Sequence, residues 1–402
     1  MAQLTRRDFL RLCGTSSIGL ALAACGVGAT PTTTPAPTNT VLPTSTPFPS
    51  ATATLTSTPA PTSTATATAT VTSTPLPITL RDYADRLGKN IGVEALTGGN
   101  DSKRLELVKN EFNQITITAF TWPRSRPSIN EFVLDIPRSY ASRAQTNSQI
   151  ARAQALIWGA NAEIPSNHWL KQTGFSRDQL IEIMRTHIRT VMNDKQLATV
   201  KEWVVVNEGT QSHYFWIRGI GADFVEIAFR AAREANPNAT LIYNDFGFEY
   251  SSLPYSQRVF ALVKNLKEKG LIDAVGMQMH FLGGNEHPDP NLPLPQLKQA
   301  ILNQIRVYAD LGISVLITEL DVDLNKVPGD QEQKMKIASG VYQVVSESYL
   351  ESPNCKGLTV WGINSNDSWI TGLGGTPALL FGDNKPQQPY YATLEAFKSK
   401  LK

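Results

Sequence analysis

Eight short apolar runs alternate with amphipathic segments from residue 78 to the end of the chain, and this alternation constrains the fold more than any other feature. Continuous apolar runs are typical of parallel strands buried on both faces, whereas the segments between them repeat apolar residues at every third or fourth position, as helices do. Eight such units predict an α/β fold, a closed (β/α)8 TIM barrel, in one domain over residues 78–402. The runs span residues 90–96, 112–120, 154–160, 203–208, 241–246, 274–281, 314–322 and 357–364.

An open, doubly wound sheet is the alternative architecture for the same alternation of strands and helices. That fold would need a glycine-rich phosphate-binding turn after an early strand. The candidate turn, Gly98-Gly99-Asn100, lacks the G-x-G-x-x-G spacing. The closed barrel is therefore the favoured prediction.

The first 25 residues carry two sorting signals. Arg6-Arg7-Asp8-Phe9-Leu10, followed by an uncharged stretch too short to span a bilayer, resembles a twin-arginine export signal. Leu22-Ala23-Ala24-Cys25 resembles the lipobox of bacterial lipoproteins, in which the cysteine is acylated. We expect residues 1–25 to be a signal peptide and Cys25 the lipidation site of an exported protein anchored at the bacterial cell surface; a secreted protein with an incidental Cys25 is the alternative.

Residues 26–77 are almost entirely threonine, proline, alanine and serine. No lysine, arginine, aspartate or glutamate occurs between Leu12 and Leu80. Such a segment has no apolar face to bury, so we expect a disordered linker that holds the domain away from the membrane. Its hydroxyl groups are possible O-glycosylation sites.

Charge and cysteine content exclude several classes of protein. The chain has 37 basic and 35 acidic residues, and removal of residues 1–25 would leave it formally neutral. A neutral balance argues against an electrostatic nucleic-acid binder and gives no reason to expect an anionic substrate. With Cys13 removed and Cys25 lipidated, Cys355 has no partner, so we expect no intramolecular disulfide.

Polar residues close five of the predicted strands, at the end of a barrel where active sites lie. Glu208 and Glu319 end the fourth and seventh strands, which face one another across the mouth of an eight-stranded barrel. Two carboxyls on opposite sides of a cleft are what glycoside hydrolysis requires. A polar residue at any one of these strand ends could simply mark the start of a solvent-exposed loop. Five polar strand ends on one face of the barrel are much harder to explain in that way.

Other chemistries find no support in the sequence. The five histidines show no ligand spacing and no thiol pair is available, so we expect no metal and no cofactor. No G-x-S-x-G elbow is present for a serine hydrolase.

The motifs around the two glutamates resemble those of glycoside hydrolase family ten, the xylanase family. Trp203-Val204-Val205-Val206-Asn207-Glu208 is similar to the family's W-D-V-V-N-E segment, with Val204 in place of the usual aspartate. Ile317-Thr318-Glu319-Leu320-Asp321-Val322 is similar to its nucleophile strand. Further similarity covers most of the chain after residue 78, at residues 80–82, 228–245, 276–280, 359–362, 367–369 and 379–391.

The resemblance implies that Glu319 is the nucleophile and Glu208 the acid/base of a retaining reaction. It also implies supporting roles in which a side chain binds the sugar 2-hydroxyl, orients the nucleophile, lines the subsite or offers a flat face to the sugar ring. Asn207 would bind the 2-hydroxyl, and His280 and Asp321 would orient the nucleophile. Gln278 would line the subsite, and Trp361 and Trp369 would offer the flat faces. The alternative for His280 is a structural histidine whose ring nitrogens are hydrogen-bonded at a strand end. The alternative for the two tryptophans is ordinary packing in the core.

The sequence departs from the family where the glycone sugar is held. The family's Glu-Asn-x-x-Lys-Trp run after the second strand survives only as Trp122, and its strand-three Trp-His reads Trp158-Gly159. The resemblance implies that these two tryptophans, Trp122 and Trp158, also contribute to substrate binding. An upstream Gly-His is replaced by Ala153-Gln154. These changes predict a weaker grip on the glycone, and the candidates that could replace it are Asn161, Glu163, Arg124, Arg126 and His168.

The resemblance implies a monomeric, retaining endo-β-1,4-xylanase that acts on xylan or a related β-glycan and meets the membrane only through its lipid. A β-glycanase with another polysaccharide preference is the first alternative. A weakly active or inactive cell-surface glycan-binding protein is the second. An intact acid and nucleophile pair argues against pure binding.

Overall fold

The computed structural model describes residues 79–95, 101–158 and 164–401. Within this part of the chain, parallel strands close into a barrel in the order β10-β1-β2-β3-β5-β6-β7-β9, and β9 pairs with β10 to complete the ring. The predicted (β/α)8 fold is therefore confirmed. The barrel strands are β1 Ile91–Glu94, β2 Gln114–Ile117, β3 Ile150–Ala153, β5 Glu202–Asn207, β6 Thr240–Asp245, β7 Ala274–Met277, β9 Ser314–Asp323 and β10 Cys355–Val360.

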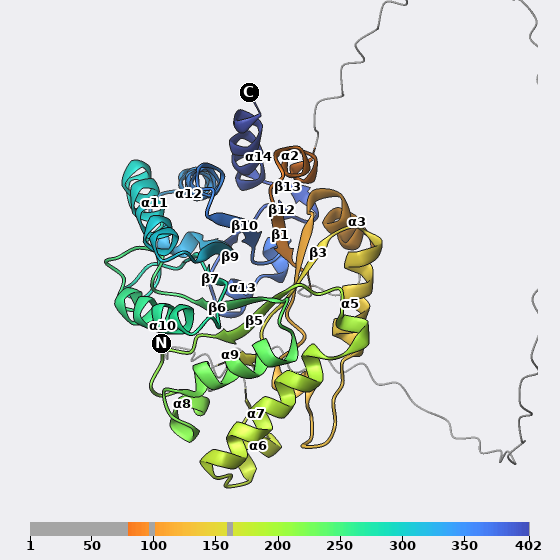
Figure 1. Cartoon of the computed structure of the whole chain (residues 1–402). Helices are drawn as coiled ribbons and strands as arrows, with labels where there is room; N and C mark the ends of the chain where they lie inside the picture. The colour runs from red at the N-terminus through yellow and green to blue at the C-terminus, as the bar shows by residue number, and fades with distance from the viewer. Residues whose placement is uncertain (1–78, 96–100, 159–163, 402) are drawn as a thin grey trace, which may run out of the picture. The chain divides into compact units, whose positions relative to one another are not determined.

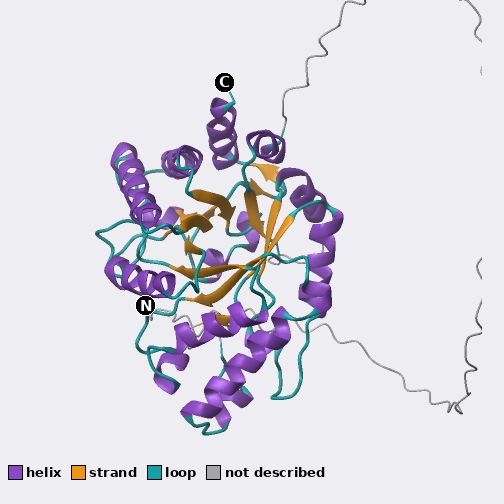
Figure 2. Ribbon diagram, viewed as in Figure 1, coloured by secondary structure: helices purple, strands orange, loops and turns teal. Residues whose placement is uncertain are grey.

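Helices surround the strands, as the purple ring around the orange barrel in Figure 2 and the labels of Figure 1 show. The long helices are α2 Leu80–Leu87, α3 Ser102–Glu111, α5 Asp135–Thr146, α7 Arg177–Met192, α9 Phe224–Ala235, α10 Ser256–Glu268, α11 Leu294–Asp310, α12 Gln331–Glu351 and α14 Gln388–Lys400. Among these, α2, α7 and α12 begin with capping boxes, at Thr79, Ser176 and Asp330.

Short elements decorate the ends of the barrel strands. β4 Ile157–Trp158 extends the pairing on β5, and β8 His280–Phe281 extends it on β9. β11 Pro377–Ala378 pairs antiparallel with β9, and β12 Phe381–Gly382 with β13 Lys385–Pro386. The remaining elements are α4 Trp122–Ser125, α6 Trp169–Gln172, α8 Phe215–Gly219, α13 Trp369–Gly372 and the 3₁₀ turns Lys195–Leu197, Leu324–Lys326 and Ser365–Asp367.

The third strand begins earlier than the predicted run 154–160. β3 covers Ile150–Ala153, a cis peptide bond follows between Gln154 and Ala155, and β4 comes next. The prediction was wrong because β3 contains Arg152, which reads as a surface residue. Arg152 is instead fully buried and donates a 2.8 Å hydrogen bond from Nε to Oε2 of Glu202 on β5. This ion pair allows the charged side chain of Arg152 to be buried inside the barrel. A hydropathy pattern does not reveal such a pair.

A small cluster of buried apolar residues, separate from the main core cluster, contains Ala155, Val204, Ile242, Ala274 and Leu316. Val204 is the residue that stands where the related family usually has aspartate. Valine fits there because its neighbours on β6 and β9 are also apolar.

In the ranges described, no helix is long and apolar enough to cross a membrane.

Candidate active site

The site is assembled at the carboxyl ends of four neighbouring barrel strands. β5 carries Asn207 and leads to Glu208, β6 carries Asn244, and β9 carries Glu319 and Asp321. The segment after β7 supplies Gln278 and His280. All of these side chains are buried, so their polar groups must satisfy one another.

Glu319 lies at the centre of a dense hydrogen-bond network. Its Oε1 accepts from Nε2 of Gln154 at 2.7 Å and from Nδ2 of Asn244 at 2.6 Å. Its Oε2 lies 3.1 Å from Nε2 of His280, whose Nδ1 lies 2.7 Å from Oδ1 of Asp321. Nε1 of Trp369 donates to the other Asp321 oxygen at 2.6 Å. These contacts fix the orientation of the Glu319 carboxylate.

His280 carries a positive charge at neutral pH. Burial alone would lower the pKa of its imidazole, but the charges and hydrogen bonds of Asp321 and Glu319 outweigh burial and raise that pKa to about 10. A protonated imidazole donates from both nitrogens, so it bridges the two carboxylates. Glu319 therefore has a cationic donor and two amide donors that stabilise its negative charge.

Glu208 has a different environment. The neutral donors to its oxygens include Gln278 at 3.2 Å, Asn207 at 3.4 Å and the hydroxyl of Tyr214 at 3.5 Å. Such contacts stabilise a negative charge less than those around Glu319 do. Two carboxyls in unequal environments are suited to unequal roles, one as a charged nucleophile and one as a proton donor.

The turn that carries Glu208 is strained and clamped. Glu208 has a φ of 54°, in the left-handed region that a non-glycine residue rarely adopts, and its amide donates to the carbonyl of Asn244 at 2.8 Å. The next amide, of Gly209, donates to the hydroxyl of Tyr243 at 3.0 Å, and that hydroxyl donates to Asp245 at 2.5 Å. Residues of strand β6 therefore fix the backbone of the turn that carries Glu208.

Asn244 connects Asn207 on β5 to Glu319 on β9, a role that was not predicted from the sequence. Its Nδ2 donates to Oδ1 of Asn207 at 2.7 Å as well as to Glu319, and its Oδ1 accepts from Thr318 at 2.6 Å. Its position at a strand end beside the other polar residues was the available signal. Gly276 makes room for it, because a Cβ at that position would lie 2.2 Å from Oδ1 of Asn244.

We expect Gly276→Ala to displace Asn244 and to lower kcat by about 10- to 100-fold, since misplacement of a catalytic carboxylate by about 1 Å has an effect of this size. Gly174→Ala is the matched control, because no atom lies within 4 Å of a Cβ added there. Steady-state kinetics of both variants, with circular dichroism to check folding, measure the difference. A folded Gly276→Ala protein with unchanged kcat would contradict the bridging role of Asn244.

Two further carboxyls lie buried behind the site. Burial, aided by the charge of Glu208, raises the pKa of Asp245 to about 7 against the opposing hydrogen bond from Tyr243. Burial likewise raises the pKa of Glu249 to about 7. Glu249 accepts from the amide of Met279, which has a positive φ of 61° and separates Gln278 from His280. Neither carboxyl was singled out from the sequence as part of the site.

The four tryptophans expected near the substrate fall into two groups. Trp361 and Trp369 are half-buried and lie edge-on to His280, with ring centroids 6.3 and 4.9 Å away. Trp158, at the end of β4, is also half-buried. Trp122, however, is 0 % exposed, stacks on His187 at 4.2 Å and donates to the carbonyl of Leu156. We therefore leave Trp122 out of the substrate surface.

Two of the five candidates for a rebuilt glycone grip, Arg126 and His168, make structural contacts within the protein. Arg126 is 3 % exposed and donates to the carbonyls of Ile129 and Ile183, and burial lowers its pKa to about 10. Nε2 of His168 lies 3.2 Å from the carbonyl of Arg126. Arg124 is exposed, and Asn161 and Glu163 lie outside the described residues.

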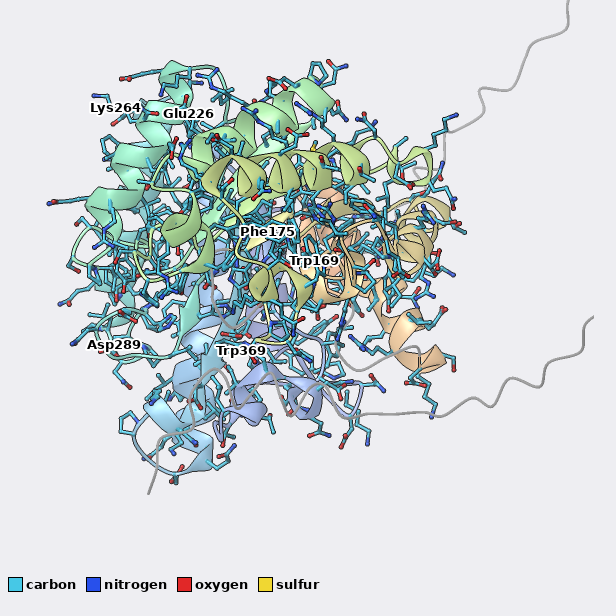
Figure 3. All side chains as sticks on the ribbon, turned by 90° about the horizontal axis from the view of Figure 1, so that it is seen from below. Trp169, Phe175, Glu226, Lys264, Asp289 and Trp369 are labelled. Atoms are coloured by element: carbon cyan, nitrogen blue, oxygen red, sulfur yellow. The ribbon has the colours of Figure 1, made fainter. Side chains whose placement is uncertain are left out.

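Aromatic rings surround the guanidinium of Arg126. It lies 5.5 Å from the ring centre of Trp122, 4.8 Å from that of Phe132 and 5.2 Å from that of Trp169. Phe175 packs in turn edge-on against Trp169, and both residues are labelled in Figure 3. This cluster is a structural support beside α4 and α6 rather than a free sugar-binding surface.

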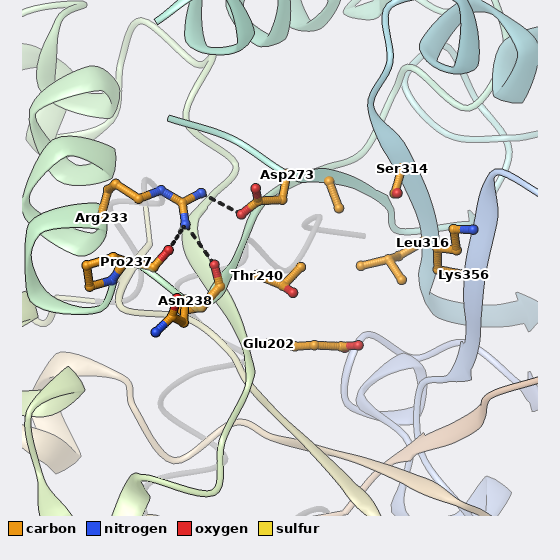
Figure 4. A pocket seen from close by; sticks show the side chains of 11 residues that line it. Glu202, Arg233, Pro237, Asn238, Thr240, Asp273, Ser314, Leu316 and Lys356 are labelled. Carbon is orange, nitrogen blue, oxygen red and sulfur yellow. Dashed lines mark hydrogen bonds and ion pairs between the residues drawn. The ribbon is translucent and has the colours of Figure 1, made fainter. Parts of the chain in front are cut away.

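A cavity of about 430 Å³ lies at the opposite, amino-terminal end of the barrel (Figure 4). Residues at strand starts, including Glu202, Thr240 and Ser314, line it, and an ion pair of 2.6 Å joins Arg233 to Asp273 at its side. It contains none of the residues around Glu208 and Glu319. In barrels of this kind, that face contributes to stability rather than to chemistry.

Comparison with known proteins assigns the family. The pattern that defines glycosyl hydrolase family 10 matches residues 79–396. The chain is 31% identical over 342 residues to endo-1,4-beta-xylanase B of Thermotoga neapolitana, which covers 81% of this chain and 93% of that protein. It is 32% identical over 318 residues to endo-1,4-beta-xylanase A of Fusarium oxysporum f. sp. lycopersici, covering 76% of this chain and 94% of that protein.

Solved structures give the same result. Native xylanase 10B of Thermotoga maritima superposes with a TM-score of 0.71 at 29% identity, over 81% of this chain and 99% of that one. Xylanase 10B of Thermotoga petrophila, solved in complex with xylobiose, superposes with a TM-score of 0.72 at 28% identity, over 82% of this chain and 100% of that one. The chain belongs to glycosyl hydrolase family 10.

Proposed function

We propose that this protein is a retaining endo-β-1,4-xylanase. The observation that carries the proposal is the pair Glu208 and Glu319, at β5 and β9 on the same rim of a family 10 barrel, with unequal hydrogen-bond environments. The relatives named above are endo-1,4-beta-xylanases, and one neighbouring structure holds xylobiose. Xylan is therefore the expected polymer.

The reaction proceeds in two displacements. In the first, a Glu319 oxygen forms a bond to the anomeric carbon while the bond from that carbon to the glycosidic oxygen breaks, and Glu208 gives its proton to the leaving oxygen. In the second, Glu208 takes a proton from water, the water oxygen attacks the same carbon, and Glu319 leaves. The two inversions restore the original β configuration.

The neighbouring residues support these steps. Asn207, held by Asn244, offers its amide to the sugar 2-hydroxyl, a contact that strengthens in the transition state. His280 and Asp321 keep the Glu319 carboxylate oriented through the hydrogen bonds given above. Trp361 and Trp369 offer flat apolar faces to the sugar ring, and Gln278 lines the subsite beside Glu208.

A reducing-sugar assay on xylan, mixed-linkage glucan, mannan and cellulose tests the substrate. We expect the highest kcat/KM on xylan, with Glu319→Ala protein as the blank. Preference for another polymer would favour the alternative β-glycanase. Binding to xylan with no release of reducing ends would show instead a glycan-binding protein.

We also propose that the enzyme is exported and works as a lipid-anchored monomer at the bacterial cell surface. The support is the sequence alone, namely the twin arginines, the lipobox at Cys25 and the uncharged linker over residues 26–77. All of these residues lie outside the described part of the chain. The linker would separate the barrel of residues 78–402 from the membrane.

We expect Cys25→Ser to move most of the protein from the membrane pellet to the soluble fraction, because the uncharged linker has no basic patch to bind lipid in place of the acyl chains. Cys13→Ser, which changes a cysteine within the expected leader, is the matched control and should remain in the pellet. Fractionation followed by immunoblotting measures the distribution. A Cys25→Ser protein that still sediments with membranes would contradict the anchor.

A further inference from the structure

The contact between Gln154 and Glu319 joins opposite sides of the barrel. Gln154 follows β3, and Glu319 lies on β9, four strands away in either direction around the ring. Despite this separation, Nε2 of Gln154 lies 2.7 Å from Oε1 of Glu319. The Gln154 side chain therefore reaches across the barrel to the carboxylate.

The backbone that carries Gln154 is held on both sides. Its amide donates to the carbonyl of Ile117 on β2 at 2.9 Å, and the amide of Leu156 donates to the carbonyl of Val204 on β5 at 3.0 Å. Gln154 as a whole residue is 5 % exposed. A donor that starts from a fixed backbone and has little free space keeps a fixed direction.

The orientation of the amide is determined by the carboxylate. Turning the amide over would place Oε1 of Gln154 against an oxygen of Glu319, and two acceptors repel one another. In the observed orientation Oε1 of Gln154 is buried and has no hydrogen-bond partner among the described residues. Leaving a buried acceptor unpaired is unfavourable, so the hydrogen bond from Nε2 to Glu319 is what maintains this arrangement.

From this geometry we propose that Gln154 is a positioning residue for the nucleophile, which uses a neutral amide to hold and stabilise the Glu319 carboxylate from across the barrel. The inference rests on the proposed function, because it assigns a role relative to Glu319 as nucleophile. It also changes the interpretation of the Gly-His to Ala153-Gln154 departure. That position keeps a donor to the reaction centre, and the donor does not titrate.

Two substitutions test the role. Gln154→Leu removes the donor, and we expect kcat to fall by about 10- to 100-fold with KM within about threefold, as for loss of a donor to a developing or existing charge. We expect the acid limb of kcat/KM to move to higher pH by about one unit, because the carboxylate is stabilised less. Gln154→Glu keeps the shape of the side chain but places a second carboxyl beside Glu319. The acid limb of kcat/KM should therefore move to still higher pH.

Gln149→Leu is the matched control. Gln149 is also buried, and its Nε2 donates to the carbonyls of Val108 and Phe112, away from Glu319. This variant should lose stability without moving the acid limb. Gln154→His, which restores the family's side chain, should recover at least about half of the wild-type kcat, since an imidazole nitrogen can donate in place of the amide.

The measurement is the pH profile of kcat/KM on xylan for the full chain and each variant, with thermal unfolding as the check on folding. Movement of the acid limb in Gln154→Leu or Gln154→Glu, but not in Gln149→Leu, supports the proposal. An unmoved limb in folded Gln154→Glu overturns it, even if kcat falls. If the wild-type chain lacks glycosidase activity, the proposed function fails, whereas an active wild type with unmoved limbs contradicts the role of Gln154 alone.

Discussion

Glu319→Ala is expected to reduce hydrolysis of every substrate by at least about 100,000-fold, because in the proposed reaction the Glu319 carboxylate forms the covalent bond to the anomeric carbon. Azide should restore turnover by entering the space left by the carboxylate and attacking the anomeric carbon. Since this attack is a single displacement, the product should be the α-glycosyl azide. Activity with and without azide, and NMR of the product, measure both effects.

The control for this prediction is Glu268→Ala, which removes an exposed glutamate of α10. It should retain wild-type activity and show no response to azide. Activity in Glu319→Ala within about 100-fold of wild type, with no α-azide formed, would show that Glu319 is not the nucleophile.

Glu208→Ala is expected to separate activated substrates from natural ones. Hydrolysis of xylan should fall by about 1,000-fold or more, because the leaving sugar oxygen needs a proton. Formation of the glycosyl-enzyme from an aryl xyloside with a good leaving group should fall by less than about tenfold, because that leaving group needs little protonation. Without a base for the second step, the intermediate should accumulate and appear as a burst of the released phenol.

Azide distinguishes this variant from Glu319→Ala. In Glu208→Ala protein, azide should attack the covalent intermediate and give the β-glycosyl azide, the anomer opposite to that expected above. Equal losses on xylan and on the activated substrate would contradict the assignment of Glu208 as acid/base. Pre-steady-state release of the phenol is the direct measurement.

The barrel itself could be predicted because its pattern is local. Each strand is a short apolar run and each helix an amphipathic segment, and eight repeats leave few ways to bury them all. The apolar pattern did not predict β3, because one charged residue interrupts it. Arg152 is charged, yet it lies inside β3 because Glu202, 50 residues later, pairs with it.

The site could be predicted only in part, for the same reason. Glu208 directly follows β5 and Glu319 lies in the carboxyl-terminal half of β9, both within recognisable motifs, so their convergence followed from the fold. The contribution of Gln154 depends on a side chain that crosses the closed ring, and that of Asn244 on hydrogen bonds to residues of both β5 and β9. Trp122 shows the converse: a motif position was kept, but its ring packs on His187 in the core. Such side-chain directions depend on tertiary contacts and leave no trace in the local pattern.

The central claim is that Glu319 and Glu208 cleave the substrate with two inversions at one carbon. Proton NMR of the first sugar released from xylohexaose, recorded before mutarotation, tests it most directly. The account predicts that the β-anomer appears first and that the α-anomer grows in later at the rate of spontaneous mutarotation. Initial release of the α-anomer would show a single displacement and would contradict the account.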